Sequence, residues 1–252
     1  MIHLVIPDGH ANPSFSNKRF RLLGRLLYDL RPDKLINLGD GADFSSLSSY
    51  DKGKRTFQGR TYQSDISSFR DSQEELWSPL KKAKRKLPYS YYFIGNHEQR
   101  IDRALDLSPE LSGTISYKDL ELEKYYDDII YYQGNTPGIR EIDGITYAHY
   151  LVSGIMGRAT SGINPATALL TTNFSSCTVG HSHLLDYSVR TTSSGKKLMG
   201  LCAGCFIDYH CEWAGEVNKL WWSGVIIKRN VENGSYDPEF VSFKRLEKEY
   251  GT

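Results

Sequence analysis

The chain has 252 residues, of which 39% are hydrophobic and 24% charged, and its formal net charge is +1. This length and apolar content suit one globular domain, and the balanced charge provides no overall field toward nucleic acid or a membrane surface. No apolar run approaches a membrane span, so the stretch at residues 2–7 is expected to be a buried strand and not a signal peptide. Four cysteines in this length are no disulfide framework, which favours a reducing, cytoplasmic compartment.

Strands and helices are expected to alternate along the chain. Leucines at helical spacing predict a helix over 16–30, with Ser16 as its N-cap and Pro32 beyond its end. The other expected elements are strands at 34–38, 89–94, 144–148, 176–179, 197–202, 220–228 and 239–244, a polar insertion or cap at about 45–75, a helix at 74–87 interrupted near Pro79, and an irregular helical region at 99–133. This order predicts an α/β sheet in a single domain over 1–252, with its active site beyond the strand C-termini.

Five polar motifs each follow a predicted strand. Imidazole and carboxylate ligands suit Zn, Mn, Fe and related metals. Residues two apart in extended backbone project from the same side, as in Asp-x-His and His-x-His. Each motif alone is an ordinary turn, but five in order predict a metal site. The motifs are Asp8-Gly9-His10, Gly39-Asp40-Gly41-Ala42-Asp43, Gly95-Asn96-His97-Glu98, His149, and Gly180-His181-Ser182-His183.

In this order the motifs resemble those of the calcineurin-like metallophosphoesterase superfamily, whose pattern is D-x-H, G-D-x-x-D, G-N-H-[E/D], H and G-H-x-H. The resemblance covers residues 8–183 and is closest to compact bacterial and phage members. It implies an α/β fold, a four-layer α-β-β-α sandwich of two mixed sheets flanked by helices. It also implies two divalent metal ions, manganese first, with iron, zinc or nickel as alternatives. The implied ligands are Asp8, His10 and His183 for one ion, Asn96, His149 and His181 for the other, and Asp40 for both.

The resemblance gives catalytic roles to two further side chains. His97 would face the substrate as a general acid or as a donor to the phosphoryl group, and Asp43 would orient it. Asn12 and Arg100, which follow the first and third motifs, are candidates for substrate binding, with turn and surface-helix roles as the alternatives. Phe44 stands where protein serine/threonine phosphatases carry an arginine, which argues against that branch.

We therefore expect hydrolysis of a nucleotide-type phosphodiester or phosphomonoester by a metal-bridging hydroxide. One alternative is a DNA or RNA nuclease, with nucleic acid as partner. Its backbone track would be residues 52–60 and a basic run, which is otherwise a solvated helix face. A second alternative is a non-catalytic metal-binding scaffold, against which the intact ligands argue. The sequence does not indicate an oligomeric state. The basic run is Lys81, Lys82, Lys84, Arg85 and Lys86.

The remaining candidates are expected to be structural. Cys202-x-x-Cys205, with Cys211 nearby, has apolar neighbours and lacks a fourth clustered cysteine, so buried thiols are expected in place of a zinc or redox site. His210 is likewise expected to be structural.

Overall fold

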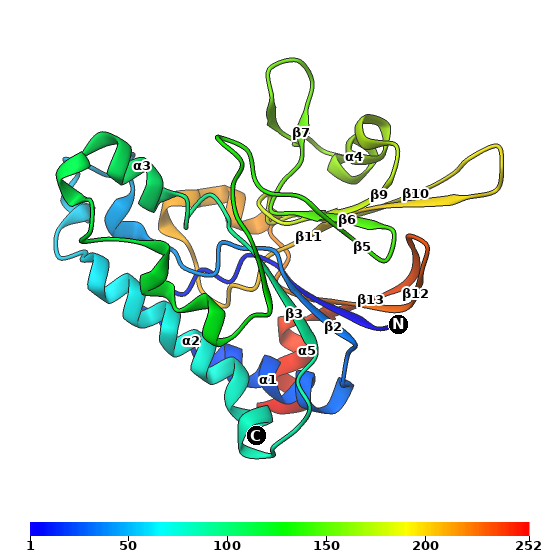
Figure 1. Ribbon diagram of the computed structural model, residues 1–252, viewed down its shortest axis with the longest axis horizontal. Helices are drawn as coiled ribbons and strands as arrows, with labels where there is room; N and C mark the ends of the chain where they lie inside the picture. Colours follow the sequence, from blue (N-terminus) through cyan, green and yellow to red (C-terminus); the bar gives the residue numbers. More distant parts are fainter. Residues whose placement is uncertain (252) are drawn as a thin grey trace.

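The computed structural model describes residues 1–251, and its core is a pair of mixed β-sheets packed face to face (Figure 1). One sheet has six strands in the order β13-β12-β1-β2-β3-β4, and β1 to β4 are parallel. β12 pairs antiparallel with β1 and with β13. The strands are β1 (His3–Ile6), β2 (Lys34–Asn37), β3 (Tyr89–Phe93), β4 (Asp128–Ile130), β12 (Gly224–Glu232) and β13 (Ser235–Ser242).

The second sheet has five strands in the order β10-β11-β9-β6-β5. β9 lies parallel to both β6 and β11, whereas β5 and β10 pair antiparallel at the edges. A separate pair, β7 with β8, forms a short hairpin. The strands are β5 (Arg140–Ile142), β6 (Ile145–Ala148), β7 (Val152–Ser153), β8 (Arg158–Ala159), β9 (Ser176–Val179), β10 (Leu185–Thr191) and β11 (Lys197–Ala203).

Helices cover the outer face of each sheet, which completes the predicted four-layer α/β sandwich (Figure 1). The six-stranded sheet is covered by α1 (Lys18–Leu30), α2 (Tyr62–Lys82) and α5 (Phe243–Tyr250). The five-stranded sheet is covered by α4 (Pro165–Asn173), and α3 (Arg100–Leu107) follows the third motif.

Alternation along the strands explains this layering. Leu4 and Ile6 of β1 pack in the cluster beneath the helices, whereas Val5 faces the other sheet. There it joins a cluster that also contains Tyr147 and Leu201 of the second sheet. Because successive side chains point to opposite faces of a strand, a strand buried on both faces is apolar throughout.

Helix α2 corrects two expectations. It runs from Tyr62 to Lys82 and passes through Pro79 without interruption. Pro79 cannot donate to the Glu75 carbonyl, but the Ser78 hydroxyl donates to that oxygen at 3.2 Å. The helix packs against α1 as part of the outer layer, so the predicted insertion at 45–75 is confined to the segment before Tyr62.

The first helix begins later than predicted. Its N-cap position is Asn17, and Ser16 lies one residue outside the helix. The Asn17 amide donates to the Ser68 carbonyl oxygen at 2.9 Å, so its side chain ties α1 to α2 and does not cap. Seven α-helices and strands of the described residues were not anticipated: β4, β5, β7, β8, β10, α4 and α5.

A polar cluster is buried between the sheets. His3 Nε2 lies 2.8 Å from Asp143 Oδ2, and its Nδ1 lies 2.9 Å from the Tyr147 hydroxyl. Lys228 pairs with His3 across the strands, and its Nζ donates to Tyr147 at 3.1 Å and to Thr178. Burial, followed by the charge of Lys228, lowers the pKa of His3 to about 4 although Asp143 opposes this shift.

The remaining structural expectations concern thiols and membrane spans. All four cysteines are free and buried, as predicted for Cys202, Cys205 and Cys211. Within residues 1–251, no helix combines the length and the apolar character needed to cross a bilayer.

Candidate metal centre

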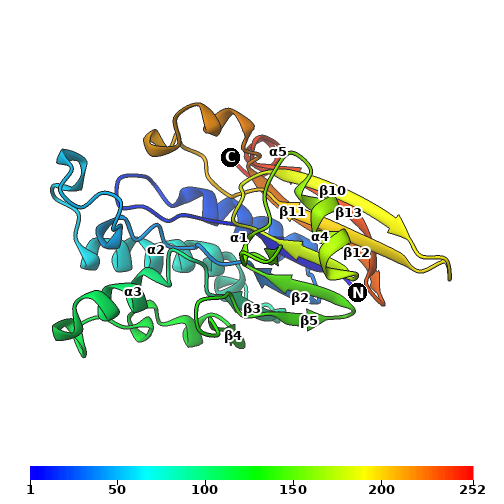
Figure 2. The same cartoon turned by 90° about the horizontal axis from the view of Figure 1, so that it is seen from above.

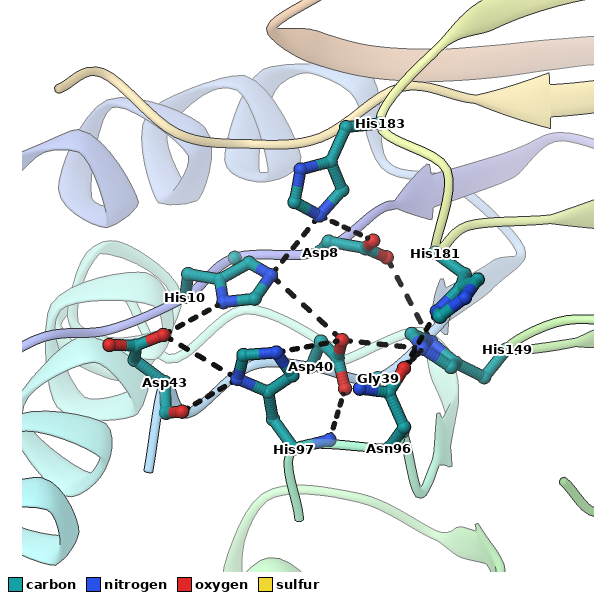
Figure 3. A network of polar contacts seen from close by, with 12 residues as sticks. Asp8, His10, Gly39, Asp40, Asp43, Asn96, His97, His149, His181 and His183 are labelled. Carbon is teal, nitrogen blue, oxygen red and sulfur yellow. Dashed lines mark hydrogen bonds and ion pairs between the residues drawn. The ribbon is translucent and has the colours of Figure 1, made fainter. Parts of the chain in front are cut away.

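The five sequence motifs meet at one edge of the sandwich. Each follows a parallel strand, and parallel strands of a sheet end at the same edge. Figure 3 shows that the side chains point toward one another from both sheets. In the six-stranded sheet, β1 leads into Asp8 and His10, β2 into Asp40, and β3 into Asn96 and His97. In the five-stranded sheet, β6 leads into His149, and β9 into His181 and His183.

A first group consists of Asp8, His10 and His183, which are all buried. His183 Nε2 lies 3.0 Å from Asp8 Oδ2 and 3.2 Å from His10 Nε2. Asp8 Oδ1 also lies 3.9 Å from His149 Nδ1, but beyond these ion-pair contacts neither buried Asp8 oxygen has a hydrogen-bond partner among residues 1–251. A buried carboxylate with unpaired oxygens is costly unless a cation satisfies it.

A second group forms around Asn96 and His149. Asn96 Oδ1 lies 2.9 Å from His149 Nε2 and 2.6 Å from His181 Nδ1. The other ring nitrogen of His149 contacts the Leu38 carbonyl oxygen at 2.9 Å. When that nitrogen donates to the carbonyl, Nε2 keeps a lone pair directed into the centre.

Asp40 lies between the two groups. Its Oδ2 is 3.3 Å from His149 Nε2 and 3.9 Å from both His10 Nε2 and His97 Nε2. Burial alone would raise the pKa of Asp40, but the nearby imidazoles of His149 and His97 hold it well below its usual range. Burial alone would likewise lower the pKa of His149, but Asp40 raises it to about 9. The Asp40 carboxylate therefore favours a positive charge between the two groups of ligands.

The backbone at the centre is strained. Four non-glycine residues there have left-handed backbone, a conformation that costs free energy and concentrates at functional sites. The turns are tight enough that a Cβ on Gly95 would collide with Asp40 Oδ1 and with the Asp40 amide. The four residues are His10 (φ 42°), Asp40 (φ 48°), His181 (φ 65°) and His183 (φ 59°).

The two predicted catalytic residues lie together beside Arg100. His97 Nδ1 is 2.6 Å from the Asp43 carbonyl oxygen and 3.5 Å from its carboxylate, so the main chain of Asp43 holds the ring more closely than its side chain does. Arg100 Nη1 donates to the carbonyl oxygens of Asp43 and Phe44, and its Nη2 lies 3.1 Å from His97 Nε2. The Asn12 amide donates to Asp43 Oδ2 at 2.7 Å and thereby holds that carboxylate.

Glu98 was given no role from the sequence. In the fold, its carboxylate connects the second and third motifs through hydrogen bonds. Its Oε2 accepts from the amides of Asp40 (3.0 Å) and Gly95 (2.9 Å), and its Oε1 accepts from Ala42 N (3.0 Å) and the Tyr92 hydroxyl (2.9 Å). Burial, followed by the charge of Asp40, raises the pKa of Glu98. Its position directly after His97 was the available signal, because a buried glutamate needs such donors.

Arg19 was also missed. Although it lies within α1, its guanidinium is buried and donates to the carbonyl oxygens of Gly9 (2.8 Å), His10 (3.2 Å) and Phe206 (3.1 Å). An ion pair with Asp208 at 3.2 Å compensates its charge. Arg19 therefore fixes the turn that carries the first motif.

The basic run does not reach this edge of the sandwich. It lies at the end of α2 and in the connection to the start of β3, whereas Asn96 and His97 follow the end of β3. The run and the centre are thus at opposite ends of the same strand. The other part of the proposed nucleic-acid track, residues 52–60, approaches the centre at its end, where Arg60 Nη1 donates to the carbonyl oxygen of Ser45, two residues after Asp43.

Buried histidine and aspartate groups that can hold metal ions thus define the centre. Three groups have one ligand atom from each residue within 4.8 Å of the others, and neighbouring groups share His10 or Asp40. A comparison with models of known protein families finds no match, and no curated protein sequence matches the chain. The three groups are Asp8, His10 and His183; His10, Asp40 and His97; and Asp40, His149 and His181.

Proposed function

We propose that this chain is a metal-dependent phosphoesterase that uses two divalent ions to hydrolyse a phosphodiester or phosphomonoester of nucleotide type. The observation that carries the proposal is the position of Asp40 between two groups of ligands. A carboxylate has two oxygens and is suited to join two ions. The order of the five motifs, which resembles that of metallophosphoesterases, supports the same reaction class.

The residues present fit two divalent ions. The Asp8 oxygens, which have no hydrogen-bond donor in the described part of the chain, and the facing nitrogens of His10 and His183 suit a cation with mixed nitrogen and oxygen ligands, such as Mn, Fe, Zn or Ni. When bound, such ions stabilise phosphoryl negative charge as Lewis acids and make water more acidic. We assign Asp8, His10 and His183 to one ion, Asn96, His149 and His181 to the other, and Asp40 to both.

His97 is assigned to proton exchange with the leaving oxygen and not to metal binding. The Asp43 carbonyl engages Nδ1, which leaves Nε2 as the reactive nitrogen. Arg100 holds a guanidinium 3.1 Å from this Nε2, and the positive charge disfavours a metal cation on the same nitrogen. Nη2 of Arg100 is also placed to bind a phosphoryl oxygen. In this scheme Asn12 acts through Asp43, to whose Oδ2 its amide donates.

The alternatives have weaker support in the fold. A scaffold without activity has no need to keep seven donors and His97 converging on one point, given the cost of burying them. A nuclease needs a continuous basic surface leading to the centre, and the basic run lies at the opposite end of β3.

The test is a parallel assay in Mn²⁺ with p-nitrophenyl phosphate, its bis ester, and single- and double-stranded DNA. Hydrolysis of the small esters is expected, and Asp40→Asn should abolish it and reduce bound metal. Asp237→Asn, a change of the same chemistry at an exposed position of strand β13, should do neither. Full activity of Asp40→Asn would contradict the shared-ligand assignment. Absence of hydrolysis with every substrate and metal would refute the function.

A further inference from the structure

Two aromatic pairs adjoin the metal centre. The Trp221 ring lies 4.2 Å from the His183 ring at an interplanar angle of 79°, and the Trp213 ring lies 5.6 Å from Trp221. A second pair lies by His10, where Phe15 stacks on Tyr209 at 3.8 Å and 5°. The Tyr209 hydroxyl donates to the His10 carbonyl oxygen at 2.7 Å. Aromatic rings thus adjoin two of the three residues of the first group.

The outer members of both pairs are open to solvent. Trp213 is 67% exposed and Phe15 is 41% exposed. Their inner partners are fixed, because Tyr209 is bonded to the main chain of His10 and Trp221 packs against buried Cys205 and Cys211. An exposed indole adds little to the stability of a fold, whereas it offers a flat apolar face to a ligand.

The segment that carries Trp213 is held in shape. It is the 3₁₀ segment η6 (Glu212–Leu220), which is drawn in orange at the top of Figure 2. The Asn218 side chain accepts from Cys211 N at 3.0 Å and donates to the carbonyl oxygens of Cys211 and Gly215. The Trp222 amide, directly after Trp221, donates to the His183 carbonyl oxygen at 3.0 Å. The chain next to Trp221 is therefore tied to the main chain of a candidate ligand, and Trp213 contacts the Trp221 ring.

We propose that Trp213 and Phe15 form a nucleobase-stacking surface, so that the preferred substrate is a nucleotide with its phosphoryl group at the metal centre. This inference rests on the proposed function for the place of the phosphoryl group. The Trp213 ring lies one indole beyond the His183 ring, and a mononucleotide carries base and phosphate on opposite sides of a ribose. Stacking tolerates any base, since every base has a π-face. Selection therefore acts on the presence of a base and not on its identity.

The test compares adenosine 5′-monophosphate with ribose 5-phosphate, which differ only in the base. Each compound is titrated by calorimetry into the Mn²⁺-loaded protein, and the two Kd values give the preference as a ratio. If the compounds are hydrolysed, the ratio of their kcat/KM values is used in its place. The wild type should prefer the nucleotide by about tenfold. Trp213→Ala should bring the ratio close to one while affinity for ribose 5-phosphate is kept, and Trp213→Phe should restore most of the preference.

Tyr89→Ala is the matched control, because Tyr89 is a half-exposed aromatic residue at the far end of β3. It should leave the ratio unchanged. Equal affinity of the wild type for both compounds, or a ratio that Trp213→Ala does not alter, would overturn the stacking surface. Selective binding of adenosine 5′-monophosphate, together with no hydrolysis of any ester in the parallel assay, would instead refute the phosphoesterase proposal and leave the stacking surface in place.

Discussion

Replacing Glu98 with glutamine tests whether this buried carboxylate holds the second and third motifs together. All three main-chain partners of Glu98 are N–H donors, namely those of Asp40, Ala42 and Gly95. Only an ionised carboxylate offers acceptors to all of them and to the Tyr92 hydroxyl at the same time. Glutamine has nearly the same shape but one acceptor oxygen in place of two.

The loss follows from counting these bonds. If the glutamine oxygen faces the amides of Asp40 and Gly95, its NH₂ group faces the Ala42 amide, donor against donor. The variant leaves the Ala42 N–H unpaired, removes the acceptor of the Tyr92 hydroxyl, and converts two charge-assisted bonds into neutral ones, which should cost about 3 kcal/mol. That is a large part of the roughly 5–15 kcal/mol by which domains are stable.

The measurement is urea unfolding after treatment with EDTA, so that bound metal does not contribute to the free energy of unfolding. The midpoint of Glu98→Gln should fall while the slope stays that of the wild type. Glu75→Gln, which removes a carboxylate paired with the half-exposed Arg21, should change stability by less than about 1 kcal/mol. Equal midpoints for the two variants would refute the role of Glu98.

Two further predictions concern histidines. The pKa of His3 is about 4 in the folded chain and about 6.5 in the unfolded chain. Between pH 6.5 and 4 the unfolded chain therefore binds more protons than the folded one. The free energy of unfolding should fall by about 3 kcal/mol as the pH drops from 6.5 to 4. His3→Gln should flatten that part of the pH dependence of the urea midpoint, and an unchanged slope would exclude His3 as its source. His97→Ala should keep wild-type metal content by elemental analysis while turnover falls about 10²–10⁴-fold; loss of metal would instead make His97 a ligand.

Much of the site was predictable because its signals are local. The motifs Asp-x-His and Gly-His-x-His at strand ends show which side chains can act as metal ligands and in which order they occur. The apolar character of both strand faces shows that these strands lie in the buried layers of the fold. Elements without a strong local pattern were missed. β4 and β5 have three residues each and gain their pairing from neighbouring strands, while Pro79 is tolerated because Ser78 replaces its missing donor.

By itself, the sequence determined the α/β class, the motifs that follow the strands, and the buried state of the thiols. Only the tertiary structure decided which donors are neighbours, since Asp8 and His183 are far apart in the chain and meet where two sheets end. It also revealed the roles of Glu98 and Arg19, and it placed the basic run away from the centre. The physical reason is that hydrophobic periodicity is encoded within a few residues, whereas a buried charge is stabilised by partners that the fold brings from distant segments.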